Sequence, residues 1–167
     1  MRSLRAAFAI LLASLRRELR TGEALLPMLL FSLVVILVSG FAFDLPELAV
    51  AFRERLVTGI LWISIAFAMI VGQARHLLAD REEERWSGLL LAPLDRTLLF
   101  GIKWIEGLLL GLALEVVLLP LCVVLFGLSL QGKLAALVAA LLVCTAGLAA
   151  LGTVLGTVVA RLGRGEA

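Results

Sequence analysis

The sequence is poor in charge, in histidine and in cysteine. Of its 167 residues, 17% are charged and 62% are apolar, and it contains one histidine and two cysteines. So little polar surface cannot cover a water-soluble globule of this size, which excludes a soluble enzyme. The sequence also lacks HExxH, GxSxG and CxxC motifs and any pair of catalytic carboxylates, so an intramembrane enzyme finds no support either. Its net charge of +2 gives no indication of a nucleic-acid partner.

Charge is missing altogether from long stretches of the chain. Residues 24–43 (20 residues), 56–74 (19) and 134–160 (27) contain no Asp, Glu, Lys or Arg, and residues 107–132 contain only Glu115. A helix needs roughly 20 apolar residues to cross a bilayer. We therefore predict an all-α integral membrane protein, a single membrane domain over residues 1–167 with four transmembrane helices. Their predicted ranges are 24–43, 56–74, 104–128 and 134–160.

Residues 1–22 have a different pattern, in which apolar and basic residues recur at helical spacing. The apolar set is Leu4, Phe8, Leu11, Leu12, Leu15 and Leu19, and the arginines offset from it are Arg2, Arg5, Arg16 and Arg20. This pattern is typical of an amphipathic helix that lies in the membrane interface. A signal peptide also begins with basic residues and a short apolar run, but Arg16-Arg17-Glu18 stands where a small-residue cleavage site belongs. We therefore predict an interfacial helix.

The basic residues between the predicted spans indicate the topology. With the N-terminus in the cytoplasm, twelve Lys and Arg residues fall inside and three fall outside. Cytoplasmic loops of membrane proteins carry an excess of basic residues. We therefore predict a cytoplasmic N-terminus, which places the polar stretch 75–103 in the cytoplasm as well.

Glycines and one carboxyl group mark two faces of the predicted spans. Gly107, Gly111 and Glu115 are spaced by four, so they share one helix face on which the glycines allow another helix to approach closely. Glu115 therefore faces protein or a cavity, either as a carboxyl group hydrogen-bonded to a neighbouring helix or as a substrate or proton site. Gly152 and Gly156 form a second helix-packing pair. The threonines able to bond their own backbone are Thr145, Thr153 and Thr157.

No cofactor site is predicted within this chain alone. His76 is the only histidine and lies beside Arg75 at the end of a span, where a solvated ring is the simpler interpretation than a haem-iron ligand. The two cysteines fall in separate apolar windows. Gly127 to Lys133 has the spacing of a phosphate-binding loop, but Leu134 stands where the magnesium-binding Ser or Thr belongs. If ATP drives this protein, another chain must therefore hydrolyse it.

The cytoplasmic stretch carries a family resemblance. It resembles the coupling segment of ABC-2 type permeases, and Gly88-Leu-Leu-Leu-Ala-Pro-Leu-Asp-Arg96 with Lys103 resembles the cytochrome c biogenesis haem exporter B family. Further sequence segments similar to that family are Arg17–Arg20, Met28–Phe31, Phe41–Asp44 and Gly59–Trp62. Members of the family usually have six spans, so we expect this four-span chain to be a shortened form.

The resemblance implies a permease subunit of the bacterial inner membrane with no catalytic residues of its own. ATP and Mg²⁺ would bind a separate ATP-binding subunit, and haem would be the cargo. The other implied partners are a haem-handling membrane subunit, a small single-span subunit, a periplasmic haem chaperone and a second copy of the chain. The residues expected to contact the ATPase are Glu82, Glu83, Glu84, Gly88, Pro93 and Arg96.

Two other functions fit the same sequence. Coupling segments of this kind occur more widely than the haem-specific text, so the chain fits a generic ABC-2 exporter of lipid, polysaccharide or drug. It also fits a non-transporting membrane scaffold, in which the cytoplasmic stretch only recruits a partner.

Overall fold

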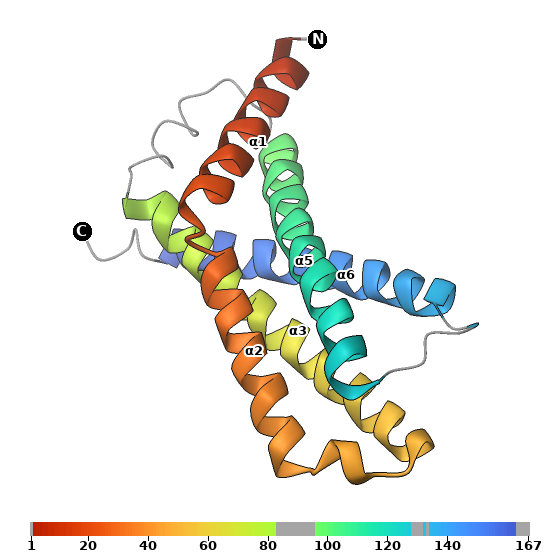
Figure 1. The fold of residues 1–167 in the computed structure, drawn as a ribbon. Helices are drawn as coiled ribbons and strands as arrows, with labels where there is room; N and C mark the ends of the chain where they lie inside the picture. Colours follow the sequence, from red (N-terminus) through yellow and green to blue (C-terminus); the bar gives the residue numbers. More distant parts are fainter. Residues whose placement is uncertain (1, 83–95, 128–131, 133, 163–167) are drawn as a thin grey trace.

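A computed structural model of the chain describes residues 2–82, 96–127, 132 and 134–162. These residues form only helices and turns, so the all-α fold predicted from the sequence is confirmed (Figure 1). The helices are α1 (Arg2–Thr21), α2 (Leu25–Ala42), the short 3-10 helix η1 (Leu45–Glu47), α3 (Val50–Glu82), α5 (Arg96–Phe126) and α6 (Leu134–Leu162).

Four of these helices are long and apolar enough to cross a membrane. Their apolar windows are Leu25–Ala42, Val50–Arg75, Thr97–Phe126 and Leu134–Leu155. α3 begins before the predicted span 56–74 and ends after it, and α5 begins before the predicted span 104–128. The physical reason is that Arg and Glu limit the apolar span without limiting the helix, since both residues have good helix propensity.

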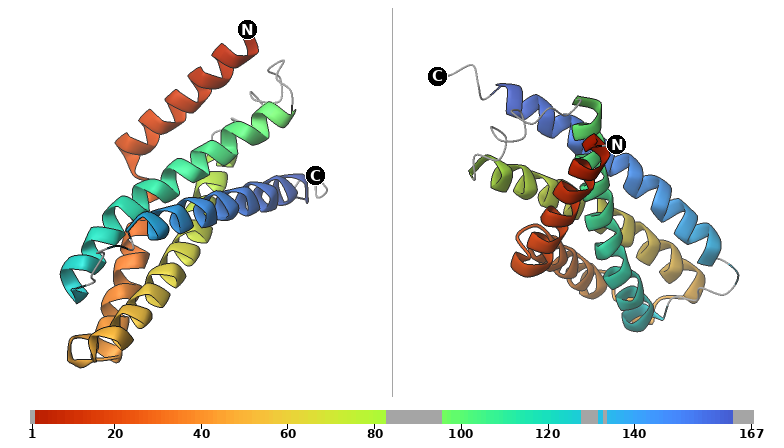
Figure 2. Two further views of the ribbon diagram at one scale, coloured as in Figure 1. Left: turned by 90° about the vertical axis from the view of Figure 1, so that its right-hand side faces the viewer. Right: turned by 90° about the horizontal axis from the view of Figure 1, so that it is seen from above.

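The helices pack around α3 and α5. α2 and α3 form a hairpin joined by η1, α5 contacts α1, α2, α3 and α6, and α6 crosses both α3 and α5 (Figures 1 and 2). Half of the apolar window of α3 is buried inside the protein, compared with 17% for the windows of α2 and α6. α3 is therefore a central helix, and α2 and α6 present most of their apolar surface outward, as suits contact with lipid.

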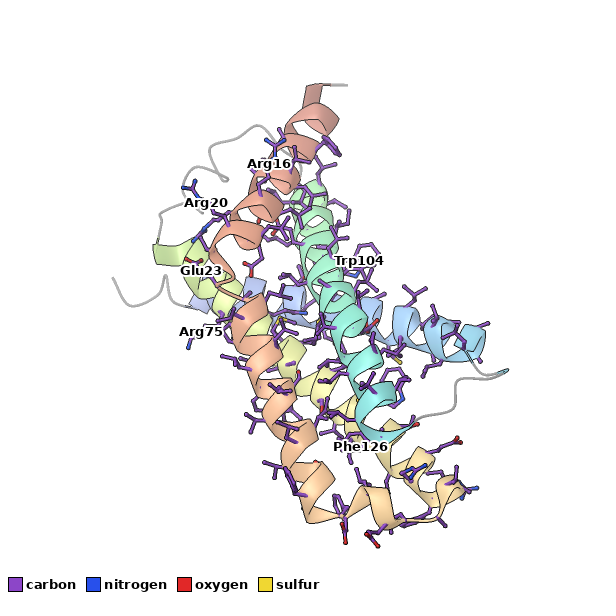
Figure 3. All side chains as sticks on the ribbon, in the orientation of Figure 1. Arg16, Arg20, Glu23, Arg75, Trp104 and Phe126 are labelled. Atoms are coloured by element: carbon purple, nitrogen blue, oxygen red, sulfur yellow. The ribbon has the colours of Figure 1, made fainter. Side chains whose placement is uncertain are left out.

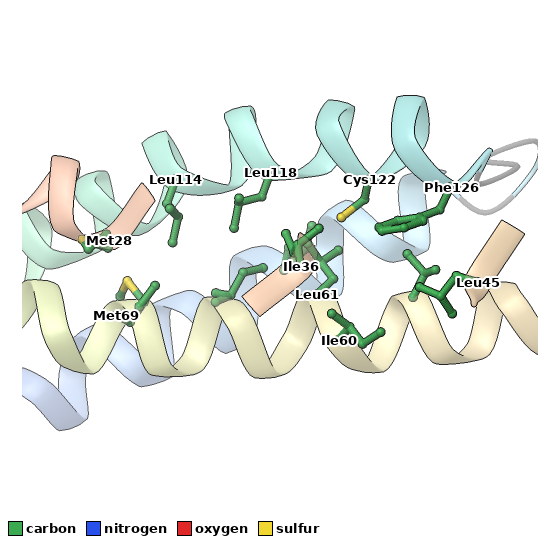
Figure 4. Close-up of a cluster of buried hydrophobic side chains, with 14 of the residues drawn as sticks. Met28, Ile36, Leu45, Ile60, Leu61, Met69, Leu114, Leu118, Cys122 and Phe126 are labelled. Carbon is green, nitrogen blue, oxygen red and sulfur yellow. The ribbon is translucent and has the colours of Figure 1, made fainter. Parts of the chain in front are cut away.

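The core is a continuous row of apolar side chains between α2, α3 and α5 (Figure 4). It extends from Met28 and Met69 at one end to Leu45 and Phe126 at the other. Glycines let the helices come close at two points of this row, because Gly72 lies against the Met28 side chain and Gly40 lies against the Phe126 ring. A Cβ at either position would have to displace its neighbour.

The turn between α1 and α2 is built around a buried carboxylate. Gly22 adopts a φ of +64° and donates its N–H to the carbonyl of Glu18 at 2.7 Å, which ends α1. The Glu18 side chain is 8% exposed, and its Oε1 accepts the backbone N–H groups of Ala24 at 2.9 Å and Leu25 at 2.8 Å. A side chain of α1 therefore caps the N-terminus of α2 and fixes the turn between them.

The remaining amides of the first turn of α2 are also accounted for. Leu26 donates to the carbonyl of Gly22 at 3.0 Å, and Met28 donates to the carbonyl of Ala24 at 3.2 Å. Pro27 stands between them and has no N–H to satisfy. The backbone donors described at the start of the first span are therefore all paired. A helix end in apolar surroundings requires this pairing.

Candidate functional site

Glu115 lies inside the helix bundle. It is 7% exposed on α5, and the hydroxyl of Thr145 on α6, which is fully buried, donates a hydrogen bond to its Oε1. An ionisable group at this depth is costly unless another group satisfies it. The partner on the neighbouring helix corresponds to the first of the two interpretations that the sequence left open for Glu115, and its functional role stays a prediction.

The threonines of α6 bond to different acceptors. Thr153 donates to the carbonyl of Ala149 at 2.7 Å, within its own helix. Thr145 was also able to bond its own backbone, but its hydroxyl donates to Glu115 on α5 instead. A carboxyl oxygen within reach is a stronger acceptor than a carbonyl already bonded within the helix. The side chain of Thr157 lies outside the described part of the chain.

The two glycines that precede Glu115 lie at contacts between three helices. At Gly111 a Cβ would collide with the Thr145 side chain of α6 and would come within 2.7 Å of the Met69 sulfur of α3. At Gly107 a Cβ would meet Ala149 at 3.5 Å, an ordinary contact. α3, α5 and α6 therefore come into close contact around Gly111, which is one helical turn from Glu115.

Gln73 of α3 reaches α6 at a second glycine. Its side chain lies against Gly152, where a Cβ would overlap it, and its Nε2 donates to the carbonyl of Leu148 at 3.2 Å. The surroundings of Gly156, the other member of the predicted pair, lie outside the described side chains. Sequence reasoning missed Gln73, although an amide within a charge-free window is a signal for a bond between helices.

Three hydrogen bonds converge on residues 145–148 of α6, which we call the α6 junction. Glu115 accepts from Thr145, Trp104 Nε1 donates to the carbonyl of Ala146 at 2.9 Å, and the third comes from Gln73. Figure 3 labels Trp104 on the side of α5 that reaches toward α6. The α6 junction thus ties the middle of α6 to both α3 and α5.

The start of the apolar part of α5 holds a buried ion pair. Lys103 Nζ lies 2.8 Å from Glu106 Oε2, and the two side chains are 12% and 3% exposed. The pairing partly neutralises both charges, which lowers the cost of placing them between packed helices. In the sequence, Lys103 was noted only for the family resemblance, and Glu106 was not noted at all.

The predicted ATPase-coupling residues lie at and between the ends of two helices. Glu82 is the last residue of α3, and Arg96 is the first of α5. Glu83, Glu84, Gly88 and Pro93 lie outside the described residues. Because α3 and α5 pack against each other, the segment that carries these residues is anchored on two helices in contact.

The part of the chain that the structure describes holds no group of three or more His, Cys, Asp and Glu side chains able to bind a metal ion. His76 lies within α3, and its side chain is outside the described set. The two cysteines differ in exposure, since Cys122 is buried in the core and Cys144 is exposed.

Comparison with known proteins gives one finding. The family model described as CcmB protein matches residues 5–167, which is nearly the whole chain. A search of curated proteins and a search of solved structures each found no match.

Proposed function

Because the chain belongs to the CcmB family, the membrane subunits of haem export ABC systems, we propose that it is the permease subunit that couples ATP hydrolysis on a partner to transport. In this proposal the permease uses the energy of ATP hydrolysis to export haem or to release a haem-loaded periplasmic chaperone. Membership of the family supports a place in the bacterial inner membrane, and the distribution of basic residues supports a cytoplasmic N-terminus. Haem is the cargo in this proposal, and ATP and Mg²⁺ belong to the partner.

One observation carries the proposed coupling: the spans continue into the coupling segment. α3 runs unbroken from Val50 to Glu82, and its 33 residues extend about 50 Å at 1.5 Å per residue. The hydrocarbon core of a bilayer is about 30 Å thick, so part of this helix stands beyond it. α5 starts at Arg96, directly before its apolar window. A push on residues 83–95 therefore acts directly on the ends of two membrane helices.

The α6 junction supports the next step. α6 is bonded to α3 through Gln73 and to α5 through Glu115 and Trp104. A shift of α3 or α5 therefore pulls on the middle of α6, and packed helices of this kind move as rigid elements. We propose that closure of the paired ATPases against residues 83–95 moves α3 and α5 and that α6 follows through the α6 junction.

The proposed assembly contains further chains. A haem-handling membrane subunit, a small single-span subunit and a periplasmic haem chaperone accompany the ATP-binding subunit. Two copies of this chain would match two ATPases. The outward apolar surfaces of α2 and α6 support such contacts, since most of each window is exposed in the single chain.

Charge reversal in the coupling segment tests the proposal. We expect the double variant Glu83→Lys/Glu84→Lys to lose the ATP-binding subunit in a pull-down while inserting normally into the membrane. Glu47→Lys is the matched control, because Glu47 is exposed in η1 at the opposite end of α3. Equal recovery of the ATPase with the double variant and with the control would refute the assignment of the coupling surface.

The identity of the co-purifying chains tests the cargo. A tagged chain extracted gently from its native membrane should bring an ATP-binding subunit together with a haem-binding membrane subunit, as mass spectrometry would show. The ATPase alone would instead indicate a generic exporter. If neither chain were recovered, that result would contradict the proposal and would favour a non-transporting membrane scaffold.

A further inference from the structure

α1 uses only one of its sides to pack against the protein. Its buried and half-buried residues include Ile10, Leu11, Ser14 and Glu18, which fall on one side of a helix with 3.6 residues per turn, and α1 packs against α5. The remaining circumference of α1 is free within the described part of the chain. The side chains on that free surface decide which kind of partner can bind to it.

The free surface of α1 has an apolar row. Phe8, Leu12 and Leu19 are 65%, 36% and 82% exposed, and the half-buried Leu15 lies in line with them. Positions 8, 12, 15 and 19 fall within roughly 60° of one another at 100° per residue. An exposed row of large apolar side chains on a helix of a membrane protein suits the boundary between headgroups and acyl chains.

A basic row borders the apolar one. Arg16 and Arg20 are exposed and lie one helical turn apart, and each directly follows a leucine of the apolar row. Arg75, at the end of the apolar window of α3, is exposed as well. Figure 3 shows the three labelled arginines toward the same side of the molecule in that view. Two helices therefore contribute to one basic surface.

Two carboxylates beside this surface have described side chains, and both are already engaged. Glu18 caps α2, and Glu23 pairs with Arg17 at 2.7 Å. The ion pairs Arg17–Glu23 and Lys103–Glu106 include none of Arg16, Arg20 and Arg75. Among the side chains that the structure describes, this surface therefore carries a net positive charge, which favours an external anion.

We propose that this free face of α1, together with Arg75, binds anionic phospholipid. Phe8 and Leu19 insert among the acyl chains, and the guanidinium groups of Arg16, Arg20 and Arg75 bind headgroup phosphates. A soluble acidic protein would match the arginines, but it would leave the apolar row uncovered. Arginine suits phosphate because its planar donors bind two oxygens at once. The proposal is independent of what the chain transports.

Electron paramagnetic resonance of the full chain in phosphatidylcholine vesicles tests this proposal. A trace of spin-labelled phosphatidylglycerol or spin-labelled phosphatidylcholine reports how much of each lipid is held at the protein surface. We expect a several-fold preference for phosphatidylglycerol that weakens in 0.5 M NaCl. Arg16→Gln, Arg20→Gln and Arg75→Gln should each lower this several-fold preference, and the three changes together should bring it close to one, since each removes one of the charges that attract the headgroup.

Arg55→Gln is the matched control, because Arg55 is also exposed on α3 but lies at its opposite end. It should leave the phosphatidylglycerol preference unchanged. Equal association of the two lipids with the unmodified chain would overturn the proposal, and so would an equal loss with Arg55→Gln. Unchanged lipid preference in the three variants with weaker recovery of an ATP-binding subunit would show instead that the surface is a protein interface.

Discussion

Replacing Glu18 by alanine tests how the first span is held. Ala24 occupies the N-cap position of α2, where its methyl group cannot accept a hydrogen bond, so Glu18 supplies the acceptor from α1. Glu18→Ala removes one oxygen that accepts two backbone N–H groups. It leaves the amides of Ala24 and Leu25 without that acceptor in a largely buried turn.

The expected cost follows from those two bonds. Loss of an N-cap side chain costs about 1 kcal/mol, and an unpaired buried donor costs about 1–3 kcal/mol. Water can reach Leu25, which is only part-buried, so we expect the free energy of opening the first turn of α2 to fall by about 2–3 kcal/mol. A difference of that size corresponds to roughly thirty-fold to 150-fold faster amide exchange.

Hydrogen exchange by mass spectrometry over residues 22–28, with the chain in detergent micelles, measures this change. Glu23→Ala is the control, because it breaks the more exposed ion pair with Arg17 and should change the opening free energy by about 0–1 kcal/mol. Glu18→Gln keeps an acceptor oxygen and should fall between the two alanine variants. Exchange in Glu18→Ala no faster than in Glu23→Ala would refute the capping role of Glu18.

Two further predictions concern the α6 junction. Thr145→Val keeps the shape of the side chain and removes its hydrogen-bond donor. A double-mutant cycle with Glu115→Leu, measured by an unfolding titration, should give a coupling energy of about 0.5–1.5 kcal/mol. A coupling energy of zero would mean that the bond does not contribute to stability. Gly152→Ala should lower stability by about 1–2 kcal/mol because its Cβ displaces Gln73, whereas Gly147→Ala has open space around it and should change stability by less than about 0.5 kcal/mol. Adding Gln73→Ala to Gly152→Ala should remove most of the penalty, and thermal unfolding in micelles that shows no such rescue would contradict the assigned contact.

The spans could be predicted from the sequence because their signal is local. Each charge-free window is long enough to cross a bilayer, and no contact with another segment is needed to see it. The ends of the helices were harder to predict, because a charge-free window shows where the apolar span ends and not where the helix ends. Arg53 and Arg55 close the apolar window of the second span, yet they lie inside α3, because a charged residue leaves the backbone hydrogen bonds of a helix intact.

The contacts between helices could be predicted only in part. The spacing of Gly107, Gly111 and Glu115 indicated a shared face, but it could not name Thr145 as the partner, because 30 residues separate the two groups that bond. Glu18 carried no signal at all. Its role depends on the turn at Gly22, which brings the start of α2 back toward a side chain of α1.

The two outer spans are held in different ways, and this difference has a mechanical consequence. α2 is fixed at its end by Glu18, and along its length its buried hydroxyl, Ser32, donates to its own helix at the carbonyl of Met28. α6 is fixed at its middle, where the α6 junction bonds it to α3 and α5. Hydrogen bonds between helices are directional, whereas apolar packing is not. α2 shares the apolar row with α3 and α5 along its length, so beyond its capped end it is held by packing, while α6 is also bonded at residues 145–148. We therefore expect a movement of α3 and α5 to reach α6 through the α6 junction and to reach α2 through the apolar row.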